Sequence, residues 1–157
     1  MRQEKNKDSL LSDVEDKLKE QIDAGKIIFD AGSETRLKKE LLRQNTGTKV
    51  TTKVQKLVLE LSKLKNLRIS SLVRASGHHG SGRAVDIGNE AIAGDLLPLV
   101  ATDSKVAELD IDEIIFDAAV AGEANRNKWN YDQGATHSYN SATLDDHKDH
   151  IHFAVKS

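Results

Sequence analysis

The segment Asp149-His150-Ile151-His152-Phe153-Ala154-Val155 decides how the fold of this chain is interpreted. Successive side chains of a strand point to opposite faces, so His150 and His152 share one face while the apolar residues between them occupy the other. The apolar face is suited to a protein core. We therefore predict a strand over residues 150–155 that carries two imidazoles on one side.

A second cluster, His78-His79-Gly80-Ser81-Gly82-Arg83-Ala84-Val85-Asp86, lies upstream. Asp86 falls in a short apolar strand, where a carboxylate is costly to bury unless it is paired or binds a metal. The turn at Gly82 lets His79 and Asp86 approach one point. The two clusters together contain what a catalytic zinc site requires: three nitrogen or carboxylate ligands and a separate carboxylate to move protons.

The remaining chain predicts an α+β domain in which helices pack on an antiparallel sheet. Apolar spacing indicates helices over 8–24, 34–44, about 51–64 and 90–100, the last interrupted by Pro98. Alternation indicates strands over 67–73, 84–87, 111–116 and 150–155. Residues 121–142 are expected to form a long polar loop. We predict one domain over 1–157, with a helical N-terminal portion at 1–50 and a catalytic core at 67–155.

The amino-acid composition limits the classes of partner and cofactor that the protein is expected to bind. The net charge is −2, which gives no electrostatic case for nucleic acid. The chain has no cysteine, so a metal must be held by histidine and carboxylate. No apolar run is long enough to span a membrane, and the charged start, Met1 to Asp8, is not a Sec signal peptide. A monomer is expected.

The two clusters resemble a known pair of motifs. His79 to Asp86 is similar to the His-x-x-Gly-x-Ala-x-Asp signature of the zinc D-alanyl-D-alanine carboxypeptidases and L-alanyl-D-glutamate endopeptidases, which share a fold with the Hedgehog signalling domain. Asp149 to Phe153 resembles the second signature, in which an acidic residue stands three positions before the last zinc ligand. The resemblance covers about residues 67–155 and implies a Hedgehog/DD-peptidase-like fold.

The resemblance implies that His79, Asp86 and His152 hold one zinc ion per chain. The family usually has Ser-x-His before the glycine turn, and Ser76-Gly77-His78 fits that triplet, whereas the spacing to the aspartate fits His79. We choose His79 because ligand spacing is a geometric constraint, and His78 stays the alternative ligand.

The resemblance also implies catalytic roles. Asp149 would be the general base, and His150 would polarise the substrate or stabilise the oxyanion. Arg74 would hold a substrate carboxylate or steady the tetrahedral intermediate. Apart from the resemblance, Ser76 and two aromatics of the long loop, Trp129 and Tyr131, are expected along the substrate groove, and Trp129 fits simple packing equally well.

These features have ordinary structural interpretations as well. His150 and His152 also fit a plain polar strand face, and Asp86 fits the charged edge of a surface turn. His137 and His147 are expected to face solvent. For the whole protein, the alternatives are a zinc-containing module that binds peptide or cell wall without turnover, and a metal-free interaction domain. The acidic residue of the second motif argues against the module, because a structural site needs no proton shuttle.

The function expected from motifs and resemblance is a zinc metallopeptidase, a carboxypeptidase or endopeptidase, acting on the peptidoglycan stem peptide. The resemblance alone supplies the cell-wall substrate, since fold and site do not fix a substrate. With no Sec signal, the protein is expected to be made in the cytoplasm and to reach the wall by a phage-type or injection route.

Overall fold

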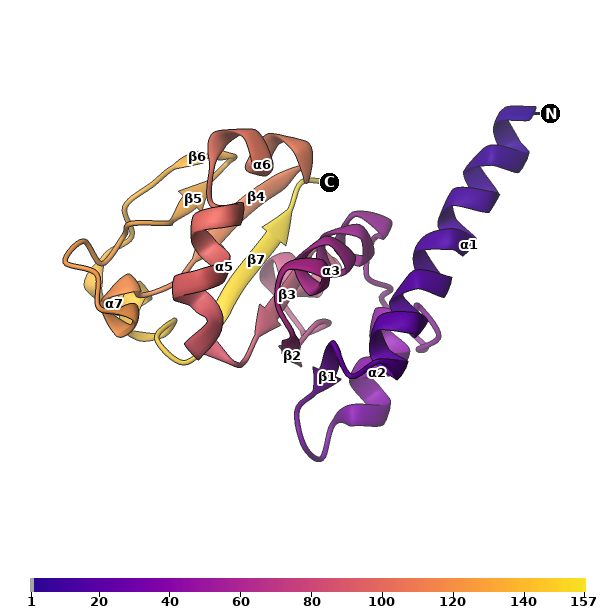
Figure 1. Ribbon diagram of the computed structural model, residues 1–157, viewed down its shortest axis with the longest axis horizontal. Helices are drawn as coiled ribbons and strands as arrows, with labels where there is room; N and C mark the ends of the chain where they lie inside the picture. Colours follow the sequence, from indigo (N-terminus) through magenta and orange to yellow (C-terminus); the bar gives the residue numbers. More distant parts are fainter. Residues whose placement is uncertain (1) are drawn as a thin grey trace.

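The computed structural model describes residues 2–157, with side chains described from residue 13 onward. One mixed sheet of seven strands has the order β1-β2-β3-β7-β4-β5-β6 (Figure 1). The strands are β1 Ile27–Phe29, β2 Leu67–Ser71, β3 Ala84–Ile87, β4 Ile111–Ile115, β5 Tyr131–Asp132, β6 Ala135–Thr136 and β7 Ile151–Val155. The helices are α1 Arg2–Asp23, α2 Glu34–Leu41, α3 Thr52–Leu64, α4 Gly77–Gly80, α5 Ala93–Val100, α6 Asp103–Glu108 and α7 Ser141–Asp145, with short 3₁₀ turns η1 Glu90–Ile92 and η2 Ala118–Ala121.

The predicted α+β class is confirmed, but the prediction of an antiparallel sheet is wrong. Strand β1 pairs with β2 in parallel, with Ile27 opposite Leu67, whereas the other strand pairs are antiparallel. The chain passes through α2 and α3 between β1 and β2, and a helical crossover of this kind returns the chain in its original direction. The three residues of β1 lie inside the portion that was predicted to be helical, so the parallel pair was missed.

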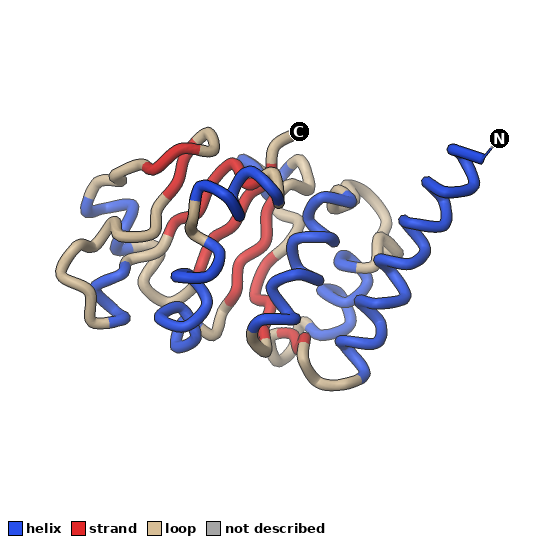
Figure 2. Tube along the Cα trace, turned by 45° about the horizontal axis from the view of Figure 1, so that its top comes forward, coloured by secondary structure: helices blue, strands red, loops and turns tan. Residues whose placement is uncertain are grey.

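The N-terminal portion shares its core with the sheet. Leu18 of α1 and Leu37 of α2 are fully buried and belong to the same apolar cluster as Ile69 of β2 and Phe153 of β7. Helix α1 lies beside α3 and β1 (Figure 1), and the strands run between flanking helices (Figure 2). Residues 13–50 therefore help to hold the sheet on which the histidine clusters lie.

Helix α3 packs on β3 and β7, the two central strands. Its start follows the prediction, because the Thr51 hydroxyl accepts a hydrogen bond from the backbone N–H of Val54. Val85 and Phe153 are fully buried. Because side chains alternate along a strand, the residues next to them, Asp86 and His152, face the opposite side of the sheet from this core.

Two other segments depart from their predicted form. The helix predicted over 90–100 begins as a 3₁₀ turn and continues as α5, with Pro98 inside it. The loop predicted over 121–142 contains the hairpin β5–β6, whose turn residues Gln133 and Gly134 both have positive φ, as expected for a tight hairpin turn. Across residues 2–157, no helix combines the length and the apolar composition that crossing a bilayer requires.

Candidate metal centre

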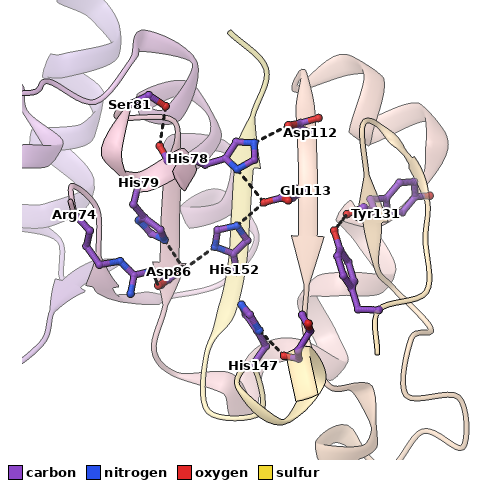
Figure 3. A network of polar contacts seen from close by, with 12 residues as sticks. Arg74, His78, His79, Ser81, Asp86, Asp112, Glu113, Tyr131, His147 and His152 are labelled. Atoms are coloured by element: carbon purple, nitrogen blue, oxygen red, sulfur yellow. Dashed lines mark hydrogen bonds and ion pairs between the residues drawn. The ribbon is translucent and has the colours of Figure 1, made fainter. Parts of the chain in front are cut away.

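Two neighbouring strands bring the aspartate of one motif beside a histidine of the other. In the antiparallel pair of β3 and β7, Asp86 lies opposite His152, and Oδ1 of Asp86 is 3.0 Å from Nδ1 of His152. His79, in α4 just before β3, places Nε2 3.2 Å from the same oxygen (Figure 3). The structure thus brings together the three residues that the sequence predicted as ligands.

The three donor atoms are spaced for a single cation. They all lie within 4.8 Å of one another, and ligands about 2.0–2.1 Å from a tetrahedral zinc ion would lie about 3.3–3.4 Å apart. Each of the three residues is at most 7% exposed. A buried carboxylate flanked by two imidazoles is a donor set that divalent transition metals accept. The group could therefore hold a metal ion.

Both imidazoles are oriented by a hydrogen bond on the nitrogen that faces away from the group. Nδ1 of His79 lies 2.7 Å from the carbonyl oxygen of Leu72, to which it donates. Nε2 of His152 lies 3.0 Å from Oε1 of Glu113. Metal-binding histidines usually donate their second N–H to a carbonyl or a carboxylate, which fixes the tautomer and the ring orientation. The cluster has this arrangement at both imidazoles.

The glycine turn between α4 and β3 is closely packed. Gly82 has a φ of +72°, and a Cβ atom added there would lie 2.1 Å from the carbonyl oxygen of Lys49. Its own carbonyl accepts a hydrogen bond from the backbone N–H of Thr51 at 2.9 Å. Only glycine fits this position without movement of the backbone, so the turn that sets His79 over β3 depends on it.

The charges of the cluster are coupled. Burial raises the pKa of Asp86, but hydrogen bonds from His152 and His79 outweigh burial and hold that pKa well below its usual range. Burial lowers the pKa of His152, and its bonds to Asp86 and Glu113 outweigh burial and raise it. Burial also raises the pKa of Glu113, but the hydrogen bond from His152 and the charges of His152, His78 and His147 together outweigh burial and lower that pKa. These shifts favour positive charge at the position between the two carboxylates.

The cluster extends to three further side chains, two of which, Asp112 and Glu113, were not among the predicted site residues. Glu113 and Asp112 lie on β4, and His78, the alternative ligand, lies between them, with Nε2 2.7 Å from Asp112 and Nδ1 3.2 Å from Glu113. The signal was present in the sequence, since Ile111-Asp112-Glu113-Ile114 places two carboxylates inside an apolar strand. The reasoning applied to Asp86 also applies to that strand.

His150 lies at the edge of the buried group. Its Nε2 is 3.9 Å from Oδ2 of Asp86, and its Nδ1 is 2.8 Å from Oδ1 of Asp149. The Asp149 side chain is 82% exposed, so it contacts the cluster through His150. A hydrogen bond from His150 lowers the pKa of Asp149.

His147 is half-buried, although its sequence position predicted a solvent-facing side chain. Its ring centroid lies 5.0 Å from that of His150 and 5.8 Å from that of His152. Burial lowers the pKa of His147, which favours the neutral imidazole beside the cluster. The spacing of this residue from the second motif gave no sign of this position.

Arg74 lies against the outer oxygen of the buried aspartate. Its guanidinium donates to Oδ2 of Asp86 at 3.0 Å, and its side chain is 55% exposed. With this exposure the side chain can meet a ligand that approaches from solvent.

The residues expected along a substrate groove are placed differently. Ser76 is exposed at the start of α4, where its carbonyl accepts from the N–H of Gly80. Trp129 and Tyr131 are only 5% and 3% exposed, and burial with a hydrogen bond to Asp103 raises the pKa of Tyr131 to about 12. Strand β5 pairs with β4, so these two aromatics pack into the core and do not wall a groove.

A cavity of about 370 Å³ opens beside the cluster, and His150, Asp149, Arg68 and Ser70 contribute to its lining. A larger cavity of about 670 Å³ is lined by residues of the segment 32–46 and by Val73, and none of the histidines lines it. The smaller cavity is the one that reaches the candidate centre, through His150, whose Nε2 is 3.9 Å from Oδ2 of Asp86.

No protein-family model matches the chain, and no curated protein and no solved structure matches it. The function must therefore be argued from the residues and their geometry.

Proposed function

We propose that this protein is a zinc-dependent peptidase that hydrolyses an amide bond in bacterial cell-wall peptides. The observation that carries the proposal is the buried group of His79, Asp86 and His152, whose donor atoms lie within 4.8 Å of one another. The order and spacing of the two motifs, and the helices packed on a sheet around them, support a Hedgehog/DD-peptidase-like fold as part of the same proposal.

We propose zinc as the metal, on the resemblance of the two motifs to those of zinc peptidases. Two imidazoles and one carboxylate, without thiolates, match catalytic zinc sites with three protein ligands and an open position. His79, Asp86 and His152 would hold one ion per chain. When bound, zinc would acidify a water molecule and polarise the scissile carbonyl.

The residues around the group supply proton transfer and orientation. Nε2 of His150 faces Asp86, while its Nδ1–H is held by Asp149. Asp149 thereby fixes the tautomer in which Nε2 can accept a proton from the attacking water and return it to the leaving amine. The resemblance assigned the general base to Asp149 and the polarising role to His150. Because the Asp149 side chain is 82% exposed, we propose instead that Asp149 orients His150 and that His150 moves the proton. The exposed donors of Arg74 would bind a carboxylate of the substrate or the developing oxyanion.

The cell-wall substrate rests on the likeness of the motifs to those of the peptidoglycan peptidases. The cavity beside His150 is open to solvent and suits an extended peptide more than a fully enclosed small molecule. Action on the wall by a phage-type or injected route belongs to the same proposal.

The test combines metal analysis with product analysis. Protein purified without chelator should contain about one equivalent of zinc, and its digest of purified peptidoglycan should give new fragments whose masses identify the cleaved bond. Asp149→Ala should lose most hydrolysis, by about 10²–10⁴-fold, with its zinc content unchanged. Asp146→Ala, at an exposed aspartate three positions upstream, is the matched control and should keep both.

Two results would contradict the proposal. Less than about half an equivalent of zinc would remove the metal centre. Wild-type protein that holds zinc and binds wall fragments but never cleaves them would identify the non-catalytic module instead.

A further inference from the structure

Strand β4 contains an irregularity at the point where it passes the metal centre. Ile111 pairs with Val155 and Glu113 pairs with Ala154, so two steps along β4 match one step along β7. Asp112 is the extra residue. Such a β-bulge redirects side chains, and bulges are frequent beside functional sites.

The bulge allows two consecutive carboxylates to face the same group of histidines. In a regular strand Asp112 and Glu113 would point to opposite faces. Here Asp112 lies 2.7 Å from Nε2 of His78 and Glu113 lies 3.2 Å from Nδ1 of the same ring. Both carboxylates thus reach the face on which His152 lies (Figure 3).

Glu113 has a defined relation to a predicted ligand. Its Oε1 accepts from Nε2 of His152 at 3.0 Å, while Nδ1 of His152 faces Asp86 at 3.0 Å. With the N–H at Nε2, the lone pair of Nδ1 is directed at the position between Asp86 and His79. A carboxylate at this place makes the imidazole a better donor and fixes its ring orientation.

We propose that Glu113 is a positioning residue of the metal centre, which holds His152 in its ligating tautomer, and that His78 and Asp112 hold Glu113 in place. The inference rests on the proposed metal-binding function. It assigns His78 to the outer support of the centre, where it orients a carboxylate and does not itself bind the ion.

Zinc affinity, measured by competition with a chromophoric chelator, tests the inference. Glu113→Gln keeps the size of the side chain and removes its charge, so zinc should bind about 10–100-fold more weakly. Glu113→Ala should weaken binding further, and Asp112→Asn should have a smaller effect through His78. Glu108→Gln, at an exposed glutamate paired with Lys105, is the matched control and should bind as the wild type does.

A spectroscopic measurement separates positioning from general stability. Cobalt substituted for zinc reports ligand geometry through its visible absorption, and Glu113→Gln should shift that spectrum in samples whose circular dichroism shows that the variant is fully folded. Equal zinc affinity and an unchanged cobalt spectrum in Glu113→Gln, beside a wild type that binds zinc tightly, would overturn the inference and leave the proposed function intact. A wild type that binds no zinc would overturn both.

Discussion

Replacement of Gly82 by alanine tests whether the turn before β3 has the close packing described above. Gly82 has positive φ, and its added Cβ would lie 2.1 Å from the Lys49 carbonyl oxygen, 2.9 Å from the Lys49 carbonyl carbon and 3.0 Å from the Cα of Val50. All three are backbone atoms, so no flexible side chain can move aside. Gly47 has a similar φ of +83° with nothing within 4 Å, and Gly47→Ala is therefore the matched control.

Both substitutions carry the cost of a left-handed alanine, about 1–2 kcal/mol. Gly82→Ala also forces apart two packed backbone segments, at a further cost of about 1–3 kcal/mol. For a chain of this size each kcal/mol lowers Tm by about 2–4 °C, so Gly82→Ala should melt about 2–12 °C below Gly47→Ala. Thermal unfolding of the metal-free proteins, followed by circular dichroism, measures the difference.

The same variant should affect the candidate metal centre, because the turn sets His79 over Asp86. Zinc affinity of Gly82→Ala should fall, whereas that of Gly47→Ala should match the wild type. Melting temperatures of the two variants within about 1 °C of each other would refute the steric reasoning, since each shares the left-handed cost and only one should have the clash.

Two other measurements follow from the structure. Hydrogen bonds from Arg126 hold the pKa of Asp117 below its usual value. The contribution of this pair to the free energy of unfolding is therefore present above about pH 4 and is lost as the pH falls further. In denaturant titrations, Asp117→Asn should be about 1–3 kcal/mol less stable than the wild type at neutral pH, and the two unfolding curves should converge in acid. In calorimetric scans, free zinc at about 100 times its Kd should stabilise the apoprotein by about 2.7 kcal/mol. The same zinc concentration should not raise the Tm of His79→Ala, and an equal rise in Tm would place the ion elsewhere.

The three candidate ligands were predicted from the resemblance of the two motifs, and short-range rules support only part of that set. Strand alternation placed His152 on the polar face, and the glycine turn joined His79 to Asp86 over seven residues. The register that sets Asp86 opposite His152 was not visible, because pairing between distant strands depends on the whole sheet.

The position of Asp112 and Glu113 beside the candidate ligands was missed for a related reason. The alternation rule assigns Asp112 and Glu113 to opposite faces, and only the register of β4 against β7 reveals the extra residue. Similarly, the parallel pairing of β1 depends on a crossover through two helices, for which Ile27-Ile28-Phe29 has no local signal beyond three apolar residues. Packing of Trp129 was one of two interpretations left open, whereas the inward position of Tyr131 was missed because it stands among polar neighbours.

The position of β7 between β3 and β4 has a kinetic consequence. Asp86 and His152 are 66 residues apart, so these two donors become neighbours only after β7 has inserted into the middle of the sheet. Closing so long a loop costs conformational entropy. The chain loses that entropy before the ligands are close enough to bind an ion, so ion binding cannot offset this cost during folding. A bound cation would then cross-link β3 and β7. It would slow unfolding without speeding folding, because it binds only after the two strands have paired. Its main effect would be on the lifetime of the folded state.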